Sequence, residues 1–185
     1  MQVIPGLEGA DAESVKAQYE KVKDLNPDGW VHWDITDGQF SPAINWGDPE
    51  AAKGIFDKKT KIELHLMVAD VEKALGDWLN TKLLKRVVVH LEAMSDPVFV
   101  VQKCREYGVE PMLAIKPETE VERLFAHKDD FRAFQVLAVN PGWPGQKFND
   151  AALEKIAWIK TKIPNAIIEI DGGVNPEVAT KCHQA

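Results

Sequence analysis

The sequence has few cysteines and no excess of basic residues. Its two cysteines, Cys104 and Cys182, form no Cys-x-x-Cys pair, which excludes a disulfide framework or a zinc finger and fits a reducing compartment. Its 22 Lys and Arg are outnumbered by 29 Asp and Glu, so the net charge is −7. Such a chain lacks the positive field that attracts nucleic acid or anionic lipid. We therefore expect a cytoplasmic protein that binds neither nucleic acid nor membranes.

Long hydrophobic runs are also missing. No apolar run approaches the ~18 residues that a membrane span needs. The first 16 residues, MQVIPGLEGADAESVK, lack the basic and apolar regions of a signal peptide. The composition is 45% hydrophobic and 28% charged, which is typical of a globular protein. We find no linker or repeat, and we expect a single domain over residues 1–185.

Short apolar runs alternate with amphipathic stretches along the chain. The runs are rich in β-branched and aromatic residues and predict strands at 3–5, 30–35, 62–68, 86–91, 111–115, 134–139 and 166–170. The intervening stretches predict helices at 11–25, 70–80, 117–126 and 176–184, with others starting after Asp96 and at Asn149. This alternation predicts an α/β fold with a parallel sheet. An eight-unit (β/α)8 barrel normally takes ~250 residues, so this chain is expected to be one unit short.

Polar side chains lie on three of the predicted strands. His32 and Asp34 are two residues apart, so both point to the same face of their strand. His65 lies inside the third strand, and Asp171 ends the seventh. Because the carboxyl ends of barrel strands converge at one mouth, these side chains are expected to meet there. Two imidazoles and two carboxylates suit Zn²⁺, Fe²⁺ or Mn²⁺, or acid–base chemistry. His90, by contrast, is interpreted as a hydrogen-bonded core residue.

Glycine-rich loops follow the last two predicted strands. One loop is Asn140-Pro141-Gly142-Trp143-Pro144-Gly145-Gln146, and the other is Gly172-Gly173-Val174-Asn175. Glycines at this place let backbone N–H groups approach a phosphate, and a following helix N-terminus favours the anion. Either loop alone could be a plain turn. Together they predict a phosphate site, with the plain turn as the alternative.

Several segments resemble the ribulose-phosphate 3-epimerase family in order and spacing. The matching segments are HWDITDGQF at 32–40, LHLMV at 64–68, VHLEA at 89–93, VNPGWPGQKF at 139–148 and IDGGVN at 170–175. The resemblance implies a (β/α)8 TIM barrel of the ribulose-phosphate-binding type. It also implies an isomerase of carbohydrate metabolism, in the pentose phosphate pathway, that interconverts D-ribulose 5-phosphate and D-xylulose 5-phosphate.

The resemblance also implies roles for individual residues. His32, Asp34, His65 and Asp171 would hold one divalent ion (Zn²⁺, Fe²⁺, Mn²⁺ or Co²⁺), which would stabilise an enediolate as a Lewis acid. Asp34 and Asp171 would also be the acid–base pair on opposite faces of C3. The substrate sugar phosphate would be bound by a larger set, namely His65, Met67, Gly142, Trp143, Pro144, Gly145, Gly172 and Gly173. Barrels of this family often associate in pairs, so the resemblance allows a homo-oligomer of this chain.

The sequence departs from the family in ways that keep other readings open. Pro144 interrupts the first glycine loop and removes a backbone donor, so another sugar phosphate is conceivable. Members of the family have an eighth strand after the position that corresponds to Ala185, where this sequence ends. We therefore interpret the chain as a barrel truncated before its eighth βα unit. We expect it to be less stable and less active than a version with that unit.

Two other functions are considered. A lyase would need an Asp-x-Lys pattern, which Asp34-Ile35-Thr36 does not match. A degenerate barrel that binds a sugar phosphate or a metal without catalysis is the main alternative.

Overall fold

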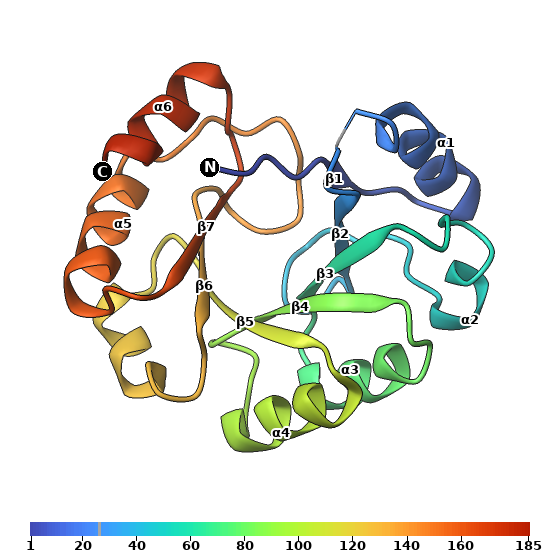
Figure 1. The fold of residues 1–185 in the computed structure, drawn as a ribbon, viewed down its shortest axis with the longest axis horizontal. Coiled ribbons are helices and arrows are strands. Elements are labelled where there is room, and N and C mark those ends of the chain that lie inside the picture. Colours follow the sequence, from blue (N-terminus) through green and yellow to red (C-terminus); the bar gives the residue numbers. More distant parts are fainter. Residues whose placement is uncertain (26) are drawn as a thin grey trace.

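The computed structural model describes residues 1–25 and 27–185. Its strands form one parallel sheet in sequential order, from β1 to β7. The strands are β1 (Gly6–Leu7), β2 (Trp30–Thr36), β3 (Lys61–Met67), β4 (Leu84–His90), β5 (Glu110–Ile115), β6 (Ala133–Leu137) and β7 (Ile167–Asp171). Figure 1 shows that the sheet curls around the centre of the molecule and that the helices lie outside it. The fold is therefore α/β and resembles a TIM barrel, as the alternation of strands and helices predicts.

A helix or 3₁₀ helix follows each of these strands. They are α1 (Ala12–Val22), α2 (Pro49–Ala52), α3 (Val71–Leu79), α4 (Pro97–Tyr107), the 3₁₀ helix η1 (Val121–His127), α5 (Ala151–Lys162) and α6 (Pro176–Gln184). The sequence explains the ends of α4 well. Asp96 accepts a hydrogen bond from the backbone N–H of Phe99, Pro97 occupies the first turn, and Gly108 ends the helix in the left-handed region.

Two of the predicted elements are wrong in detail. Residues 3–5 form no strand, and β1 begins at Gly6. Pro5 has no N–H to donate, and only its carbonyl bonds to the sheet, by accepting from the N–H of His32 at 2.9 Å. The predicted helix at 117–126 is a 3₁₀ helix that begins only at Val121. The other predicted strands overlap the observed ones, with ends shifted by one or two residues.

The register of the sheet lines up a row of polar residues inside the curl. His32 on β2 is paired with Glu63 on β3, Glu63 with Arg86 on β4, and Arg86 with Glu110 on β5. On the other side, Gln135 and Glu169 are paired across β6 and β7. Because side chains alternate along a strand, Asp34, His65 and Asp171 lie one layer further toward the carboxyl ends of their strands. The interior thus holds two successive polar layers.

Apolar side chains fill the space between the sheet and the surrounding helices. One large buried cluster extends from Leu7 on β1 to Val178 on α6 and includes Trp33 and Leu64. The outermost strands of the sheet are β1 and β7, and the N-terminal segment lies near the gap between them (Figure 1). The truncation of the barrel before an eighth βα unit stays a prediction. Within the described residues, we find no helix with the length and hydropathy required to cross a bilayer.

Candidate active site

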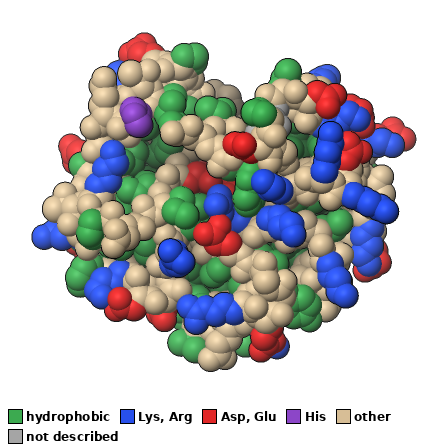
Figure 2. Space-filling view, in the orientation of Figure 1, with side chains coloured by type: hydrophobic (Ala, Val, Ile, Leu, Met, Phe, Trp, Pro, Cys, Tyr) green, Lys and Arg blue, Asp and Glu red, His purple; other side chains and the backbone are tan. Residues whose placement is uncertain are grey.

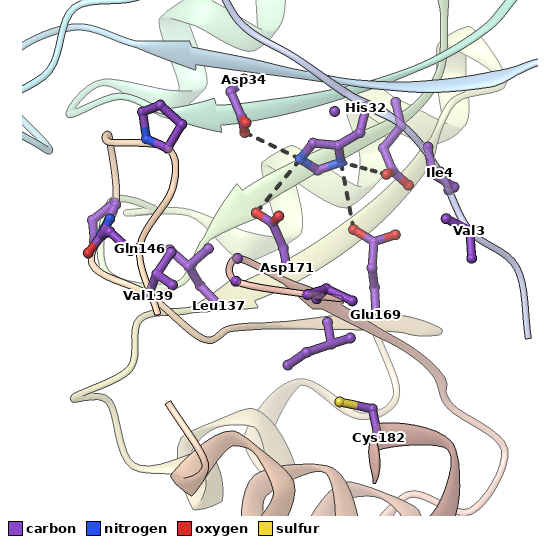
Figure 3. Close-up of a pocket in the computed structure, with 18 of the residues that line it drawn as sticks. Val3, Ile4, His32, Asp34, Leu137, Val139, Gln146, Glu169, Asp171 and Cys182 are labelled. Atoms are coloured by element: carbon purple, nitrogen blue, oxygen red, sulfur yellow. Dashed lines mark hydrogen bonds and ion pairs between the residues drawn. The ribbon is translucent and has the colours of Figure 1, made fainter. Parts of the chain in front are cut away.

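The four side chains predicted to hold a metal lie together near the carboxyl ends of their strands. Each offers one ligand atom, and these atoms all lie within 4.8 Å of one another. Nδ1 of His65 is 2.9 Å from Oδ1 of Asp34 and 3.6 Å from Oδ2 of Asp171. Nε2 of His32 is 3.3 Å from the same oxygen of Asp34 and 3.9 Å from that of Asp171. Figure 3 shows both carboxylates pointing at the imidazole of His32.

The spacing of these atoms suits a single divalent ion. Ligands bound at about 2.0–2.1 Å in a tetrahedron are separated by roughly 3.3 Å. The two imidazole nitrogens, Nε2 of His32 and Nδ1 of His65, are 3.3 Å apart. The distances from these nitrogens to the carboxylate oxygens run from 2.9 to 3.9 Å. Two imidazoles and two carboxylates are donors that Zn²⁺, Fe²⁺, Mn²⁺ and Co²⁺ all accept. The residues therefore fit one such ion.

The two carboxyl groups of this cluster differ in acidity. Burial disfavours the charged form of Asp34, but the charges and hydrogen bonds of His32 and His65 outweigh it and hold the pKa of Asp34 well below its usual range. Burial raises the pKa of Asp171; the charge of His32 opposes this shift and the charge of Asp34 adds to it. The pKa of one carboxyl group is thus lowered and that of the other raised, and such a separation suits an acid–base pair.

A second charged layer lies directly beneath the cluster, and the sequence analysis missed it. Glu63 accepts a hydrogen bond from Nη1 of Arg86 at 2.6 Å and lies 2.7 Å from Nδ1 of His32. Glu169 lies 3.7 Å from both Arg86 and His32. Burial and the charge of Glu63 raise the pKa of Glu169 to about 8. His32, Glu63 and Glu169 are also close enough to hold an ion, but Arg86 already pairs with Glu63 at 2.6 Å, so we interpret this layer as a support for the cluster above it.

His65 is connected to a further chain of buried polar groups. Its Nε2 lies 2.9 Å from Nε2 of His90, whose Nδ1 lies 3.2 Å from Glu92. His90 is fully buried and stacks on His65 with ring centres 5.0 Å apart. Burial lowers the pKa of His90 to about 4, although Glu92 opposes this shift. The expectation that His90 is a hydrogen-bonded core residue is confirmed, and the residue also contacts the cluster.

A cavity of about 710 Å³ opens beside the cluster, which is a size that suits a small ligand. His32, Asp34 and Asp171 line it, and so do seven of the eight residues predicted to bind substrate: Met67, Gly142, Trp143, Pro144, Gly145, Gly172 and Gly173. The eighth, His65, is fully buried and does not line the cavity. Figure 2 shows charged side chains gathered in a hollow at the centre of the molecule. The cavity thus joins the acidic cluster to the glycine loops.

Each of the two loops has a position that requires glycine. Gly173 has φ of +68°, and a Cβ at this position would lie 2.5 Å from the backbone nitrogen of Phe148. Gly142 has φ of +108°, and a Cβ there would lie 2.6 Å from Oγ of Ser41. Both backbones therefore adopt a conformation that other residues rarely reach, in contacts too close for a side chain. The loops expose backbone to the cavity, as the phosphate prediction requires.

Comparison with known proteins gives the family of the chain. The model of the ribulose-phosphate 3 epimerase family matches residues 2–185. The chain belongs to this family. Ribulose-phosphate 3-epimerase of Candida glabrata is 29% identical over 191 residues, which cover 95% of this chain and 77% of that protein. The cytoplasmic isoform of the same enzyme from Oryza sativa subsp. japonica is 28% identical, over 95% of this chain and 78% of that protein.

Solved structures support the fold independently of the family match. Tryptophan synthase of Pyrococcus furiosus superimposes with a TM-score of 0.69 over 99% of this chain and 83% of that chain, at 15% identity. At such a low identity, the structural similarity shows the fold alone. It places this epimerase family member among proteins with TIM-barrel-like sheets.

Proposed function

We propose that the protein is a metal-dependent epimerase that inverts C3 of a pentulose 5-phosphate and interconverts D-ribulose 5-phosphate and D-xylulose 5-phosphate. The observation that carries the proposal is the pairing of Asp34 with Asp171 at one cavity, in a chain of the ribulose-phosphate 3-epimerase family. The names of the curated relatives support the same substrate. The proposal includes a cytoplasmic location, as in the rice isoform.

The chemistry requires one group to remove the C3 proton and another to return a proton to the opposite face. Asp34 is held ionised by its two histidine neighbours and can act as the base. Asp171 has a raised pKa and can act as the acid. The two groups exchange roles in the reverse direction. Both point into the same site from strands β2 and β7, which lets them act on opposite faces of one carbon.

The remaining residues bind and orient the sugar phosphate. His32, Asp34, His65 and Asp171 would hold the divalent ion, which when bound stabilises negative charge on the substrate oxygens next to C3. The backbone of Gly142–Gly145 and Gly172–Gly173 would receive the phosphate, which would place C3 toward the carboxyl groups. Met67 would pack against the sugar. We also propose that residues 1–185 form one domain of the ribulose-phosphate-binding barrel type, because the strands share one sheet and one large apolar core.

Proton exchange at C3 tests this function directly. The protein, loaded with Zn²⁺ or Mn²⁺, is incubated with D-ribulose 5-phosphate in D₂O, and the C3 proton is followed by NMR. We expect loss of the C3 proton signal and formation of D-xylulose 5-phosphate. Removal of the metal by a chelator should stop both, and re-addition should restore them. Unphosphorylated D-ribulose, which lacks the group for the glycine loops, should exchange much more slowly. A protein that binds metal and sugar phosphate but exchanges no proton would instead be the degenerate barrel.

A further inference from the structure

Each imidazole of the candidate metal site uses one ring nitrogen inside the cluster and the other outside it. His32 turns Nε2 toward Asp34 and Asp171, and its Nδ1 faces Glu63 at 2.7 Å. His65 does the opposite. It turns Nδ1 toward the two carboxylates, and its Nε2 faces His90 at 2.9 Å. Without a cation, the cluster-facing nitrogens can be protonated and donate to Asp34, but a histidine that binds a metal must be neutral and carries one proton, on one of these nitrogens. The groups outside the cluster therefore decide which nitrogen is left to bind a cation.

Glu63, which faces His32 from outside the cluster, determines which nitrogen of the neutral His32 ring carries the proton. Glu63 is fully buried and accepts from Arg86 through Oε2, so its other oxygen faces His32 as an acceptor only. A hydrogen bond at this place requires the proton of His32 to be on Nδ1. Nε2 then carries a lone pair that points into the cluster. Glu63 thus prepares His32 to bind a metal through Nε2.

The partner of His65 is oriented through one additional residue. Oε1 of Glu92 accepts from the backbone N–H of Lys116 at 2.9 Å and from the hydroxyl of Thr119, and Oε2 faces Nδ1 of His90 at 3.2 Å. The proton of His90 must therefore be on Nδ1. Its Nε2 is left as an acceptor, because a second proton would create a charge in a fully buried ring. His65 then donates from Nε2, and its Nδ1 carries the lone pair.

We propose that Glu63 and the His90–Glu92 pair are positioning residues that hold the two histidines of the site in opposite tautomers, with the proton on Nδ1 in His32 and on Nε2 in His65. The inference rests on the proposed metal-dependent function and adds residues outside the ligand set. Partners of this kind commonly change metal affinity by 10- to 100-fold. The same proton placement explains why a buried imidazole pair, His65 and His90, can lie nitrogen to nitrogen without two donors facing each other.

Nitrogen NMR of the histidine rings tests the proposal in the wild-type protein. The chain has five histidines, which are labelled with ¹⁵N, and the Zn²⁺-loaded protein is examined by long-range ¹H–¹⁵N correlation. We expect the retained proton on Nδ1 of His32 and on Nε2 of His65. The same tautomer in both residues would overturn the proposal. A wild-type protein that binds no divalent ion would instead overturn the proposed function, so the two failures are distinguishable.

Glu92→Gln offers a nearly isosteric reversal of the proton pattern. The Gln oxygen is needed by the N–H of Lys116, so the amide NH₂ must face His90 and donate to its Nδ1. His90 then carries its proton on Nε2 and donates to His65, whose Nδ1 becomes protonated. We expect the Kd for Zn²⁺ to rise about 10- to 100-fold, with a changed ¹⁵N pattern at His65 and an unchanged one at His32.

A second variant and a control complete the test. His90→Phe preserves the stacking on His65 but removes the acceptor, so we expect it also to weaken Zn²⁺ binding. Glu50→Gln makes the same chemical change in an exposed residue that pairs with Lys53, and it should bind Zn²⁺ like the wild type. Thermal melts confirm that each variant folds. Wild-type Zn²⁺ affinity in folded Glu92→Gln and His90→Phe would contradict the proposal.

Discussion

Replacing Asp34 or Asp171 by Asn is expected to lower epimerisation by about 10²- to 10⁴-fold, the contribution typical of one general acid or base. Asn has almost the shape of Asp but cannot accept or return the C3 proton. The two variants should also differ from each other, because each retains one of the two carboxyl groups. We expect each variant to exchange the C3 proton of only one of the two epimers with D₂O, and the two variants to select opposite epimers.

The measurement uses purified D-ribulose 5-phosphate and D-xylulose 5-phosphate in separate reactions at saturating metal, because both residues are also candidate metal ligands. Asp129→Asn is the control, since the side chain of Asp129 is 84% exposed and pairs with the neighbouring Lys128. This variant should epimerise like the wild type. If Asp34→Asn exchanged both epimers at the wild-type rate, Asp34 would have no role in proton transfer.

Replacing Arg86 by Met is expected to lower the free energy of unfolding by about 3–5 kcal/mol, the usual cost of leaving one member of a buried ion pair without its partner. Arg86 bonds to Glu63 at 2.6 Å and to Glu110 at 2.8 Å, and it lies 3.7 Å from Glu169. Met fills similar space without charge, so the fully buried carboxylate of Glu63 would lose its cation. Urea denaturation at pH 7, with a check that the slope is unchanged, measures this loss.

The pH dependence of this loss has a definite sign. The hydrogen bonds and charges of His32 and Arg86 outweigh burial and lower the pKa of Glu63 from 4.5 to about 2. A carboxyl group with a lowered pKa stabilises the fold above its unfolded pKa, and this stabilisation disappears as the pH falls toward the folded value. The stabilisation that the Glu63 carboxylate gives to the wild type should therefore be complete above about pH 4.5 and disappear toward pH 2, and Arg86→Met should show less of it because Arg86 helps to lower this pKa.

Two comparisons determine what the result means. Lys103→Met removes an exposed cation that pairs with Glu106 and should leave stability almost unchanged. The double variant Glu63→Leu with Arg86→Met removes both buried charges and should recover much of the stability lost in the single variant. A loss below about 1 kcal/mol in Arg86→Met would show that the interior layer does not depend on this cation.

The candidate site could be located from the sequence because two simple rules of strand geometry place its residues. His32 and Asp34 share a strand face through period-two alternation, and His65 and Asp171 lie toward the carboxyl ends of other parallel strands. The same alternation also applies to Glu63 and Glu169, which stand two residues before His65 and Asp171. They were missed because a charged residue within a strand is more easily read as solvent-facing. The register of the sheet places Arg86 beside Glu63, and only the curled structure shows that Arg86 also lies 3.7 Å from Glu169.

The fold could be predicted as an alternation of elements, but not at every boundary. The stretch at 117–126 has a helical pattern, yet its first carbonyls bond to a distant side chain. Nζ of Lys155 donates to the carbonyls of Lys116, Pro117 and Thr119. The hydroxyl of Thr119 is in turn bonded to Glu92. These tertiary contacts hold the chain out of a helix until residue 121, and no local pattern contains that information.

The central claim is that His32, Asp34, His65 and Asp171 hold one divalent ion at the place where C3 chemistry occurs. Crystals grown with Zn²⁺, with diffraction recorded on both sides of the zinc absorption edge, test it most directly. We predict one anomalous peak within about 2.0–2.2 Å of Nε2 of His32, Nδ1 of His65 and an oxygen of each aspartate. A protein that crystallises with no peak among these four side chains, or with zinc bound only elsewhere, would contradict the account.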